Sequence, residues 1–192
     1  MKIIKDNVTT QSKYMEIHST VYEDKEGKHK EWSWVSRPNN VKAVMIVPIV
    51  IDKTEDGGYK GLNRICVIKE FRVPLINDYE WGFPAGLIDV SNESTEECIA
   101  RELKEETGLD LDYIYEISPY TYNSAGITDE SIAMAFVRAK GTLSQDKLES
   151  SEEIETFLMD QSEVLELLHT DNKFGAKAWL IMRHFAKHNH VI

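Results

Sequence analysis

The chain has few of the features that mark secreted, membrane-spanning and disulfide-stabilised proteins. Its 192 residues include two cysteines, Cys66 and Cys98. Both fall in segments predicted to be buried, which favours a reduced, cytoplasmic protein over a disulfide framework. No apolar run reaches the roughly 18 residues that a transmembrane helix needs, and residues 1–19 lack the apolar core of a signal peptide. We therefore expect neither secretion nor a membrane span.

Positive charge is also scarce. The chain carries 22 Lys and Arg against 33 Asp and Glu, which gives a formal net charge of −11. Such a surface repels the backbone of a nucleic-acid polymer, so we expect no long DNA or RNA as a partner. A small phosphate compound is still compatible with this charge, because bound divalent ions invert the local sign of a carboxylate cluster.

Length and turn residues predict one domain with an N-terminal appendage. Residues 14–35 alternate imperfectly between apolar and polar types around a polar tip at 23–28, which predicts a β-hairpin. Pro38, Asn39 and Asn40 then break the pattern. We assign residues 1–40 to an N-terminal antiparallel β-hairpin and residues 41–192 to the main domain.

The main domain is predicted to mix strands and helices without regular βαβ alternation, which indicates an α+β fold. Apolar and β-branched runs place strands at 41–50, 64–72, 113–119, 131–140 and 154–159, and helices between 94 and 108, at 162–169 and at 175–188.

An ordered set of carboxylates follows the sequence Pro84-Ala85-Gly86, which we interpret as a turn. On a helix Glu102 and Glu106 are i and i+4, and Glu105 lies beside them. Like charges at this spacing cost roughly 0.2–0.5 kcal/mol per pair, so the cluster calls for a cation. Oxygen ligands without nearby Cys or His favour Mg²⁺, with Mn²⁺ as an alternative. The competing interpretation is a solvated, glutamate-rich helix face.

The helix carries its own start and stop signals. Ser94 with Glu97 three residues later fits a capping box, and Gly108 fits the position that ends a helix. Arg101 is i+4 from Glu97 and i−4 from Glu105, so we expect it to pair with both and to orient Glu105.

This segment resembles the signature box of the Nudix hydrolases, Gly-x5-Glu-x7-Arg-Glu-U-x-Glu-Glu-x-Gly-U, where U is aliphatic. The pattern is filled by Gly86, Glu93, Arg101, Glu102, Leu103, Glu105, Glu106, Gly108 and Leu109. One departure is that six residues rather than five separate Gly86 from Glu93, which affects how Glu93 is placed and leaves the helix register intact.

The resemblance spans about residues 41–188 and implies an α/β/α sandwich with a mixed β-sheet. It implies Mg²⁺-dependent hydrolysis, with Glu102 and Glu106 as metal ligands, Glu105 assisting and the main-chain carbonyl of Ala85 as a further ligand. In ADP-ribose-type members a catalytic glutamate lies in a later loop. The acidic stretch 149–155 corresponds to that loop, and Glu152 aligns best, followed by Glu153. A mobile polar loop is the alternative for this stretch.

Other segments resemble ADP-ribose and nucleoside-diphosphate-sugar pyrophosphatases. They are the run 70–72, the segment 83–89, the run 124–126 and the pair 129–130. The N-terminal hairpin is similar to the dimerisation region of those enzymes, which implies a homodimer. Ala125 stands where they usually carry proline, and Gly82 stands nearest to their usual glutamate. We therefore expect a nucleoside diphosphate linked to a sugar as substrate, hydrolysed to a nucleoside monophosphate and a sugar phosphate.

Four residues are candidates for substrate contacts. The forked donors of Arg72 suit a phosphate or ribose, although a strand-end surface arginine is the alternative. Trp32 and Trp34 suit stacking on a nucleobase, although tryptophans at this spacing are more often core or interface residues. Gly126 belongs to the loop that the resemblance assigns to the substrate site.

Two other functions remain open at this point. A nucleotide-sensing Nudix module without turnover is disfavoured by the complete carboxylate set. A nucleoside triphosphate pyrophosphohydrolase is disfavoured by the N-terminal hairpin, which minimal members lack.

Overall fold

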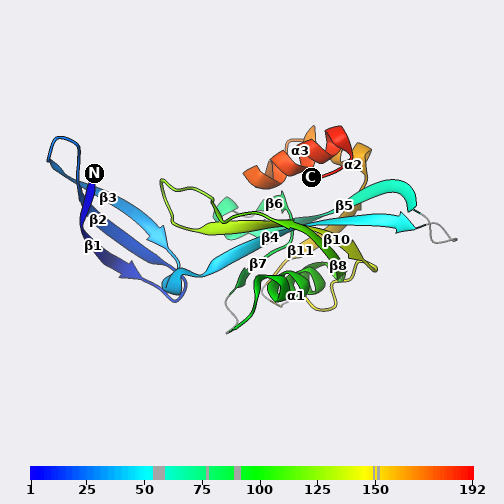
Figure 1. Ribbon diagram of the computed structural model, residues 1–192, viewed down its shortest axis with the longest axis horizontal. Helices are drawn as coiled ribbons and strands as arrows, with labels where there is room; N and C mark the ends of the chain where they lie inside the picture. The colour runs from blue at the N-terminus through cyan, green and yellow to red at the C-terminus, as the bar shows by residue number, and fades with distance from the viewer. Residues whose placement is uncertain (54–58, 77, 89–91, 149, 151) are drawn as a thin grey trace.

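The computed structural model describes residues 1–53, 59–76, 78–88, 92–148, 150 and 152–192. Within these residues, two sheets and three α-helices form the fold (Figure 1). The elements are β1 (Lys2–Gln11), β2 (Glu16–Glu23), β3 (His29–Ser36), η1 (Pro38–Asn40), β4 (Lys42–Lys53), β5 (Tyr59–Arg72), η2 (Val73–Leu75), β6 (Asp78–Gly82), β7 (Ala85–Ile88), α1 (Thr95–Thr107), β8 (Asp110–Ile117), β9 (Thr121–Tyr122), β10 (Ser131–Lys140), β11 (Ile154–Met159), α2 (Gln161–Leu168), β12 (Lys173–Phe174) and α3 (Ala176–His188).

The main sheet is mixed and lies between two helical layers, with α1 on one face and α2 and α3 on the other (Figure 1). Its strands run in the order β12-β6-β5-β4-β10-β8, and β4 and β10 are parallel. Alternation along β4 explains the layers, because successive side chains point to opposite faces of a strand. Val44 and Ile46 pack with α1, whereas Met45 and Val47 pack with α2 and α3. The predicted α+β sandwich is therefore confirmed.

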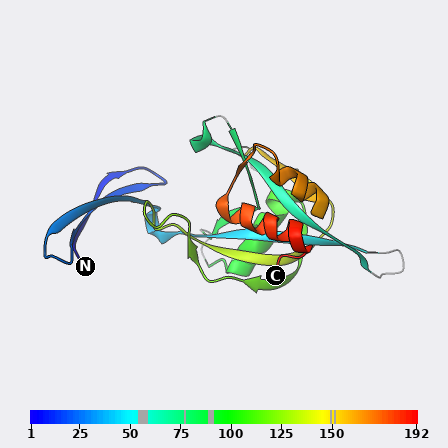
Figure 2. The ribbon, with the colours of Figure 1, turned by 90° about the horizontal axis from the view of Figure 1, so that it is seen from above.

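The N-terminal region forms a separate antiparallel sheet, β1-β2-β3, which projects from the main domain (Figures 1 and 2). The predicted hairpin corresponds to β2 and β3, but the prediction missed β1. Eight of the ten residues of β1 pair with β2, yet nine of the ten are exposed. A strand held mainly by backbone pairing carries no burial pattern from which it could be recognised.

The Pro84-Ala85-Gly86 segment differs from the prediction of a turn. Ala85 begins β7, which pairs antiparallel with β4 so that Ala85 lies opposite Met45 and Gly86 opposite Val44. All four residues of β7 are only partly buried, so the strand has no clean alternation of polar and apolar positions. This pairing fixes the main chain of β7 against α1.

Within the described residues, no helix combines the length and apolar character needed to cross a membrane. Residues 54–58, between β4 and β5 in the sequence, lie outside the described part of the chain.

Candidate active site

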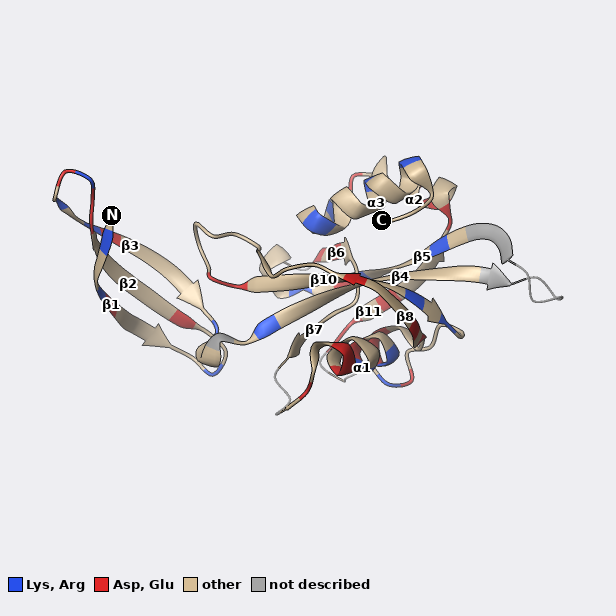
Figure 3. Ribbon diagram, viewed as in Figure 1, with Lys and Arg blue, Asp and Glu red and all other residues tan. Residues whose placement is uncertain are grey.

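Helix α1 carries the carboxylates and is anchored at both ends as expected. Ser94 and Glu97 form the capping box, with Ser94 Oγ accepting from the Glu97 N–H and the Glu97 carboxylate accepting from the Ser94 N–H. Gly108 ends the helix with φ 77°, a left-handed conformation that favours glycine. Ile99 and Leu103 are fully buried against the sheet. Their burial fixes the rotation of α1 about its axis, and therefore the positions of its acidic residues (Figure 3).

Arg101 is the cationic centre of this face. Its guanidinium forms a bidentate pair with Glu93, through Nε at 2.7 Å and Nη2 at 3.0 Å. Its Nη1 donates to Glu102 at 2.7 Å and to Glu105 at 3.1 Å. The predicted pairing with Glu105 is confirmed. The predicted pairing with Glu97 is wrong, because Glu97 is used in the capping box and Glu93 takes its place at Arg101.

The extra residue before Glu93 therefore does not displace this glutamate from the box. The side chain of Glu93 is 8% exposed, and its pKa is lowered first by the hydrogen bonds from Arg101. Residues 89–91, which belong to the segment between Gly86 and Glu93, lie outside the described residues.

Glu106 is the most deeply placed carboxylate of the helix, with 3% of the residue exposed. Its Oε2 accepts a 3.3 Å hydrogen bond from the N–H of Ala85. Burial, followed by the charges of Glu70, Glu102 and Glu152, raises its pKa well above the usual range. Buried carboxylates that repel one another are a fitting donor set for a hard divalent cation.

Three further carboxylates share this environment. Burial raises the pKa of Glu102, with the charges of Glu105 and Glu152 adding to the shift. Burial also raises the pKa of Glu70 to about 7, although Arg72 opposes the shift. Glu152 raises the pKa of each of its neighbours Glu70, Glu102 and Glu106. The cluster thus joins α1, the end of β5 and the chain before β11.

Gly86 is required by the position of Glu102. A Cβ atom at Gly86 would lie 1.9 Å from Glu102 Oε1 and 2.0 Å from its Cδ. Any side chain here would push the Glu102 carboxylate out of its place. The motif has glycine here because the Glu102 carboxylate lies where a Cβ atom would be, and not because the backbone needs a left-handed conformation.

The two candidate bases are placed differently. Glu153 is exposed, accepts a hydrogen bond from the Tyr79 hydroxyl and offers its main-chain carbonyl to the N–H of Phe71 at 3.0 Å. Glu152 is partly buried and lies within electrostatic reach of the carboxylate cluster.

A cleft of about 590 Å³ opens beside the cluster. Ala85 and Gly86, which contact Glu106 and Glu102, form part of its wall together with Glu70. Arg72 also lines it and pairs with Glu70 at 2.7 Å and with Glu80 at 3.6 Å. Arg72 is therefore a cleft residue and not an isolated surface arginine.

A second set of polar and charged residues, not predicted from the sequence, lies in the same cleft. Arg37 Nε donates to Glu130 at 2.9 Å, Asn123 donates to Glu130 at 2.9 Å, and Lys177 donates to Asn123 at 2.5 Å. Burial alone would raise the pKa of Glu130, but the bonds from Asn123 and Arg37 hold it below its usual value. The only sequence signal was the pair 129–130, since the other partners lie far away along the chain.

The two tryptophans have different surroundings. Trp34 stacks on His18, with ring centroids 4.0 Å apart, and donates to Thr20 at 2.7 Å. Trp32 is 50% exposed and donates to the main-chain carbonyl of Gly126 at 3.2 Å. Both line an apolar pocket of about 550 Å³ between the N-terminal sheet and the loop after β9.

The carboxylates present are of the type that binds a divalent cation, but their oxygens are not yet arranged around one point. Among the described residues, no three Asp, Glu, His or Cys side chains are placed to hold one ion as they stand. Glu102 is held by Arg101 and Glu106 by the Ala85 N–H. Binding of a cation would therefore require these carboxylates to exchange their present partners for the ion.

Comparison with known proteins identifies the family of the chain. The family model described as the NUDIX domain matches residues 42–180. The chain belongs to the NUDIX domain family. The Nudix hydrolase identified from the carboxylate motif is thus confirmed, and the matched region contains the whole acidic cluster.

Several relatives of this Nudix chain are known. An uncharacterized Nudix hydrolase of Schizosaccharomyces pombe is 30% identical over 85% of this chain and 80% of its own length. The ADP-ribose pyrophosphatase of Saccharomyces cerevisiae is 30% identical over 79% of this chain and 66% of its own length. The ADP compounds hydrolase NudE of Escherichia coli is 42% identical over 43% of this chain and 39% of its own length.

A crystal structure of an ADP compounds hydrolase superposes with a TM-score of 0.70 at 22% identity, covering 100% of this chain and 96% of that one. The N-terminal sheet is therefore part of the shared fold, since the match includes it.

The raised pKa of Glu70 predicts how the metal-free protein responds to pH. Its carboxyl has a pKa of about 7 when folded, above the ordinary value of 4.5. The folded state therefore favours the protonated form of Glu70. The stabilisation that results is fully present below about pH 4.5 and is lost as the pH rises through about 7. In EDTA, the free energy of unfolding of the wild type, measured against Glu70→Gln, should fall by at most about 3 kcal/mol between pH 4.5 and 8.

Urea denaturation at each pH measures this difference. Glu155→Gln is the matched control, because Glu155 lies on the adjacent strand with its side chain 56% exposed, and it should run parallel to the wild type. Parallel curves for Glu70→Gln and the wild type would show that Glu70 is not held in its neutral form.

Proposed function

We propose that the protein hydrolyses the diphosphate bond of a nucleoside diphosphate linked to a sugar, giving a nucleoside monophosphate and a sugar phosphate. The observation that carries this proposal is the repelling cluster of Glu70, Glu102, Glu106 and Glu152 beside a cleft that also presents arginines. Acidic groups that need a cation, next to basic groups that suit phosphate oxygens, match a metal-assisted attack on a diphosphate.

Mg²⁺ is the proposed cofactor, with Mn²⁺ as a substitute. Glu102 and Glu106 would hold it, with Glu105 and the main-chain carbonyl of Ala85 assisting. Support comes from the contact between Ala85 and Glu106, which brings this main-chain segment to the carboxylate. When bound, the ion would neutralise the diphosphate oxygens and lower the pKa of a water molecule.

The chain's own residues then have distinct roles. Arg72 would orient the diphosphate through its forked donors. Glu152 would accept a proton from the attacking water while a new oxygen–phosphorus bond forms and the bridging bond breaks. The leaving monophosphate keeps the bridging oxygen, and the proton returns to solvent or product. Glu152 is favoured over Glu153 because its charge acts on Glu70, Glu102 and Glu106, so it lies closer to the carboxylate cluster.

Two relatives, an ADP-ribose pyrophosphatase and an ADP compounds hydrolase, support an ADP-linked compound as the first substrate to test. A nucleotide-sensing module and a triphosphate pyrophosphohydrolase remain the alternatives, and the same substrate panel separates them.

We also place the protein in the cytoplasm, since Cys66 and Cys98 are both free and buried. Detection of the protein in a secreted fraction would argue against this placement.

Glu106→Gln should abolish hydrolysis of ADP-ribose with Mg²⁺, lowering the rate by roughly a hundredfold or more, because an amide cannot neutralise the ion. The wild type should yield AMP and ribose 5-phosphate, identified by chromatography and mass spectrometry. Other nucleotide sugars and nucleoside triphosphates complete the panel.

Glu96→Gln is the control, since Glu96 is exposed on the first turn of the same helix. Thermal unfolding checks that both variants fold. Wild-type activity in Glu106→Gln would refute the ligand assignment, tight binding without turnover would favour the sensor, and preferred turnover of triphosphates would favour the pyrophosphohydrolase.

We further propose that Trp32, and not Trp34, stacks on the nucleobase. Trp34 already has one ring face on His18, whereas Trp32 is half exposed above the loop that contains Gly126. Trp32→Leu should raise the KM for ADP-ribose about tenfold, as expected for a stacking energy of roughly 1–3 kcal/mol, with little change in kcat. Trp34→Leu should instead lower thermal stability, and the reverse pattern would exchange the two roles.

The projecting N-terminal sheet supports the proposal of a homodimer. Its exposed apolar side chains include Ile3, Val8, Met15 and Ile17, and apolar patches on a projecting sheet mark association sites. Light scattering should give a dimer mass for the wild type and a monomer mass for Ile17→Glu. The control Leu180→Glu alters another exposed apolar residue, on α3. A monomeric wild type at tens of micromolar would exclude the dimer.

A further inference from the structure

A second pocket with a different charge lies beside the catalytic cleft. It has a volume of about 590 Å³, within the range of roughly 300–1,000 Å³ that is typical of small-molecule sites. Three cationic side chains line it, Lys13, Arg37 and Lys42, and none of the described residues that line it is acidic. In a chain with 33 acidic and 22 basic residues, a concave site of this composition favours an anion.

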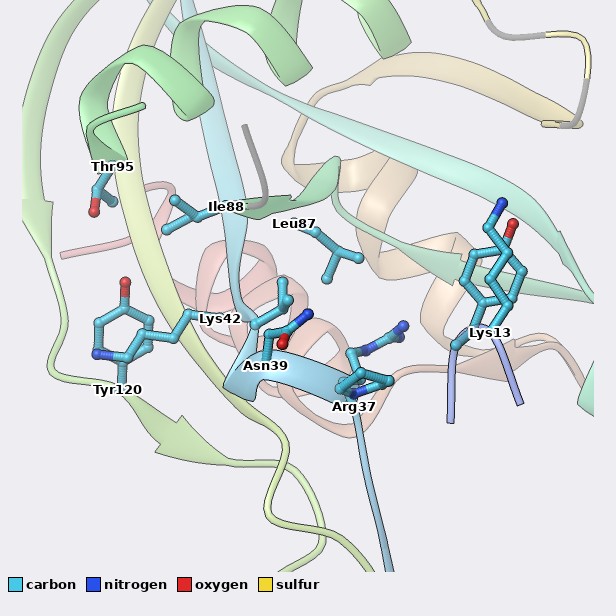
Figure 4. Close-up of a pocket in the computed structure, with 11 residues that line it drawn as sticks. Lys13, Arg37, Asn39, Lys42, Leu87, Ile88, Thr95 and Tyr120 are labelled. Carbon is cyan, nitrogen blue, oxygen red and sulfur yellow. The ribbon is translucent and has the colours of Figure 1, made fainter. Parts of the chain in front are cut away.

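The cations come from three different parts of the chain (Figure 4). Lys13 lies in the turn between β1 and β2, Arg37 precedes η1, and Lys42 begins β4. Lys42 Nζ lies 4.4 Å from the centre of the Tyr120 ring, and Lys13 Nζ lies 4.7 Å from that of Tyr14. These ring contacts hold the lysines without neutralising them, so their charge stays available to a ligand.

The polar groups are joined by an apolar wall. Val41, Leu87 and Ile88 line the pocket together with the side chains of Asn39 and Thr95 (Figure 4). Asn39 has φ 63°, a left-handed conformation that asparagine tolerates better than most residues. Cations with amide and hydroxyl donors suit phosphate oxygens, and the apolar wall suits the carbon skeleton of a phosphate ester.

The pocket is continuous in its lining with the catalytic cleft, because Arg37 and Leu87 line both cavities. Arg37 also contacts Glu130 across the cleft through Nε at 2.9 Å. A group bound in this pocket would therefore lie next to a molecule whose diphosphate occupies the cleft.

We propose that this pocket binds a phosphate monoester. The biological role of such a site rests on the hydrolysis proposed above, whereas the binding test does not require hydrolysis. Two sources share the chemistry: a further phosphate carried by the substrate outside its scissile diphosphate, or a separate phosphate monoester such as the sugar phosphate that the reaction releases. Lys13 and Lys42 are specific to this pocket, since neither lines the catalytic cleft.

The first experiment measures binding without metal or turnover. Titration calorimetry at fixed ionic strength compares ribose 5-phosphate with ribose, for the wild type and for Lys13→Gln/Lys42→Gln. The wild type should bind the ester and not the free sugar, and the double variant should bind the ester at least about tenfold more weakly, as expected for loss of charge-assisted contacts. Lys25→Gln/Lys30→Gln makes the same charge change on the N-terminal sheet and should bind like the wild type. Lys13→Arg/Lys42→Arg should restore binding.

A second experiment identifies the source. With Mg²⁺, kcat/KM is measured for ADP-ribose and for 2′-phospho-ADP-ribose. A selective loss on the phosphorylated substrate in Lys13→Gln/Lys42→Gln supports the tethered phosphate, and weakened ester binding without that loss supports the separate monoester. A wild type that does not bind ribose 5-phosphate, or a double variant that binds it as well as the wild type, overturns the proposal. Absence of turnover on both substrates would count against the proposed hydrolysis alone, since the binding result is independent of it.

Discussion

Repulsion among carboxylates is the constraint on which the rest of the site depends. Glu102 and Glu106 come from α1, Glu70 from β5 and Glu152 from the chain before β11, and burial together with their mutual charge raises the pKa of the first three. A fold built only for stability would separate such groups, because each buried charge costs free energy unless it is paired. Their assembly beside one cleft supports the proposed cation, which would offset the repulsion.

Arg101 offsets part of the repulsion among these carboxylates. One guanidinium contacts Glu93, Glu102 and Glu105, so it neutralises the outer part of the acidic face. Glu106 is beyond these contacts and has the Ala85 N–H as a donor instead. The helix thus has an outer side that Arg101 compensates and an inner side, at Glu106, that it does not. Glu106 contacts Ala85, which lines the cleft. Release of Glu102 from Arg101 would let it join Glu106 at an ion.

The sequence could predict the elements in which local chemistry and burial agree. Both ends of α1 follow from Ser94, Glu97 and Gly108, and β10 and β11 follow from their apolar runs. It could not predict β1 or β7, because those strands depend on pairing with neighbours and not on an alternating pattern. Glu97 was assigned to Arg101 for a related reason. Helical spacing identifies what can meet on a helix, but Glu93 reaches Arg101 from the preceding loop.

The same distinction applies to the site. Glu102, Glu105 and Glu106 could be named from their spacing, since one helix fixes their register. Arg37, Glu130 and Lys177 could not, because their connection through Asn123 joins segments that are distant along the chain. Charged residues of this kind have no periodicity, and only the tertiary fold shows that they share a cleft.

Arg37 also shows why the N-terminal sheet matters to the site. It follows β3 directly and reaches Glu130 in the loop before β10, while the Val35 N–H donates to the carbonyl of Ile127 in the same loop at 2.8 Å. The loop is therefore held by the N-terminal sheet as well as by the main domain. Under the proposed hydrolysis, the carboxylate cluster would carry the chemistry, and the N-terminal sheet would contribute to the choice of substrate through this loop. We would then expect a change in the N-terminal sheet to alter which molecule is bound without disturbing the carboxylates proposed to hold the cation.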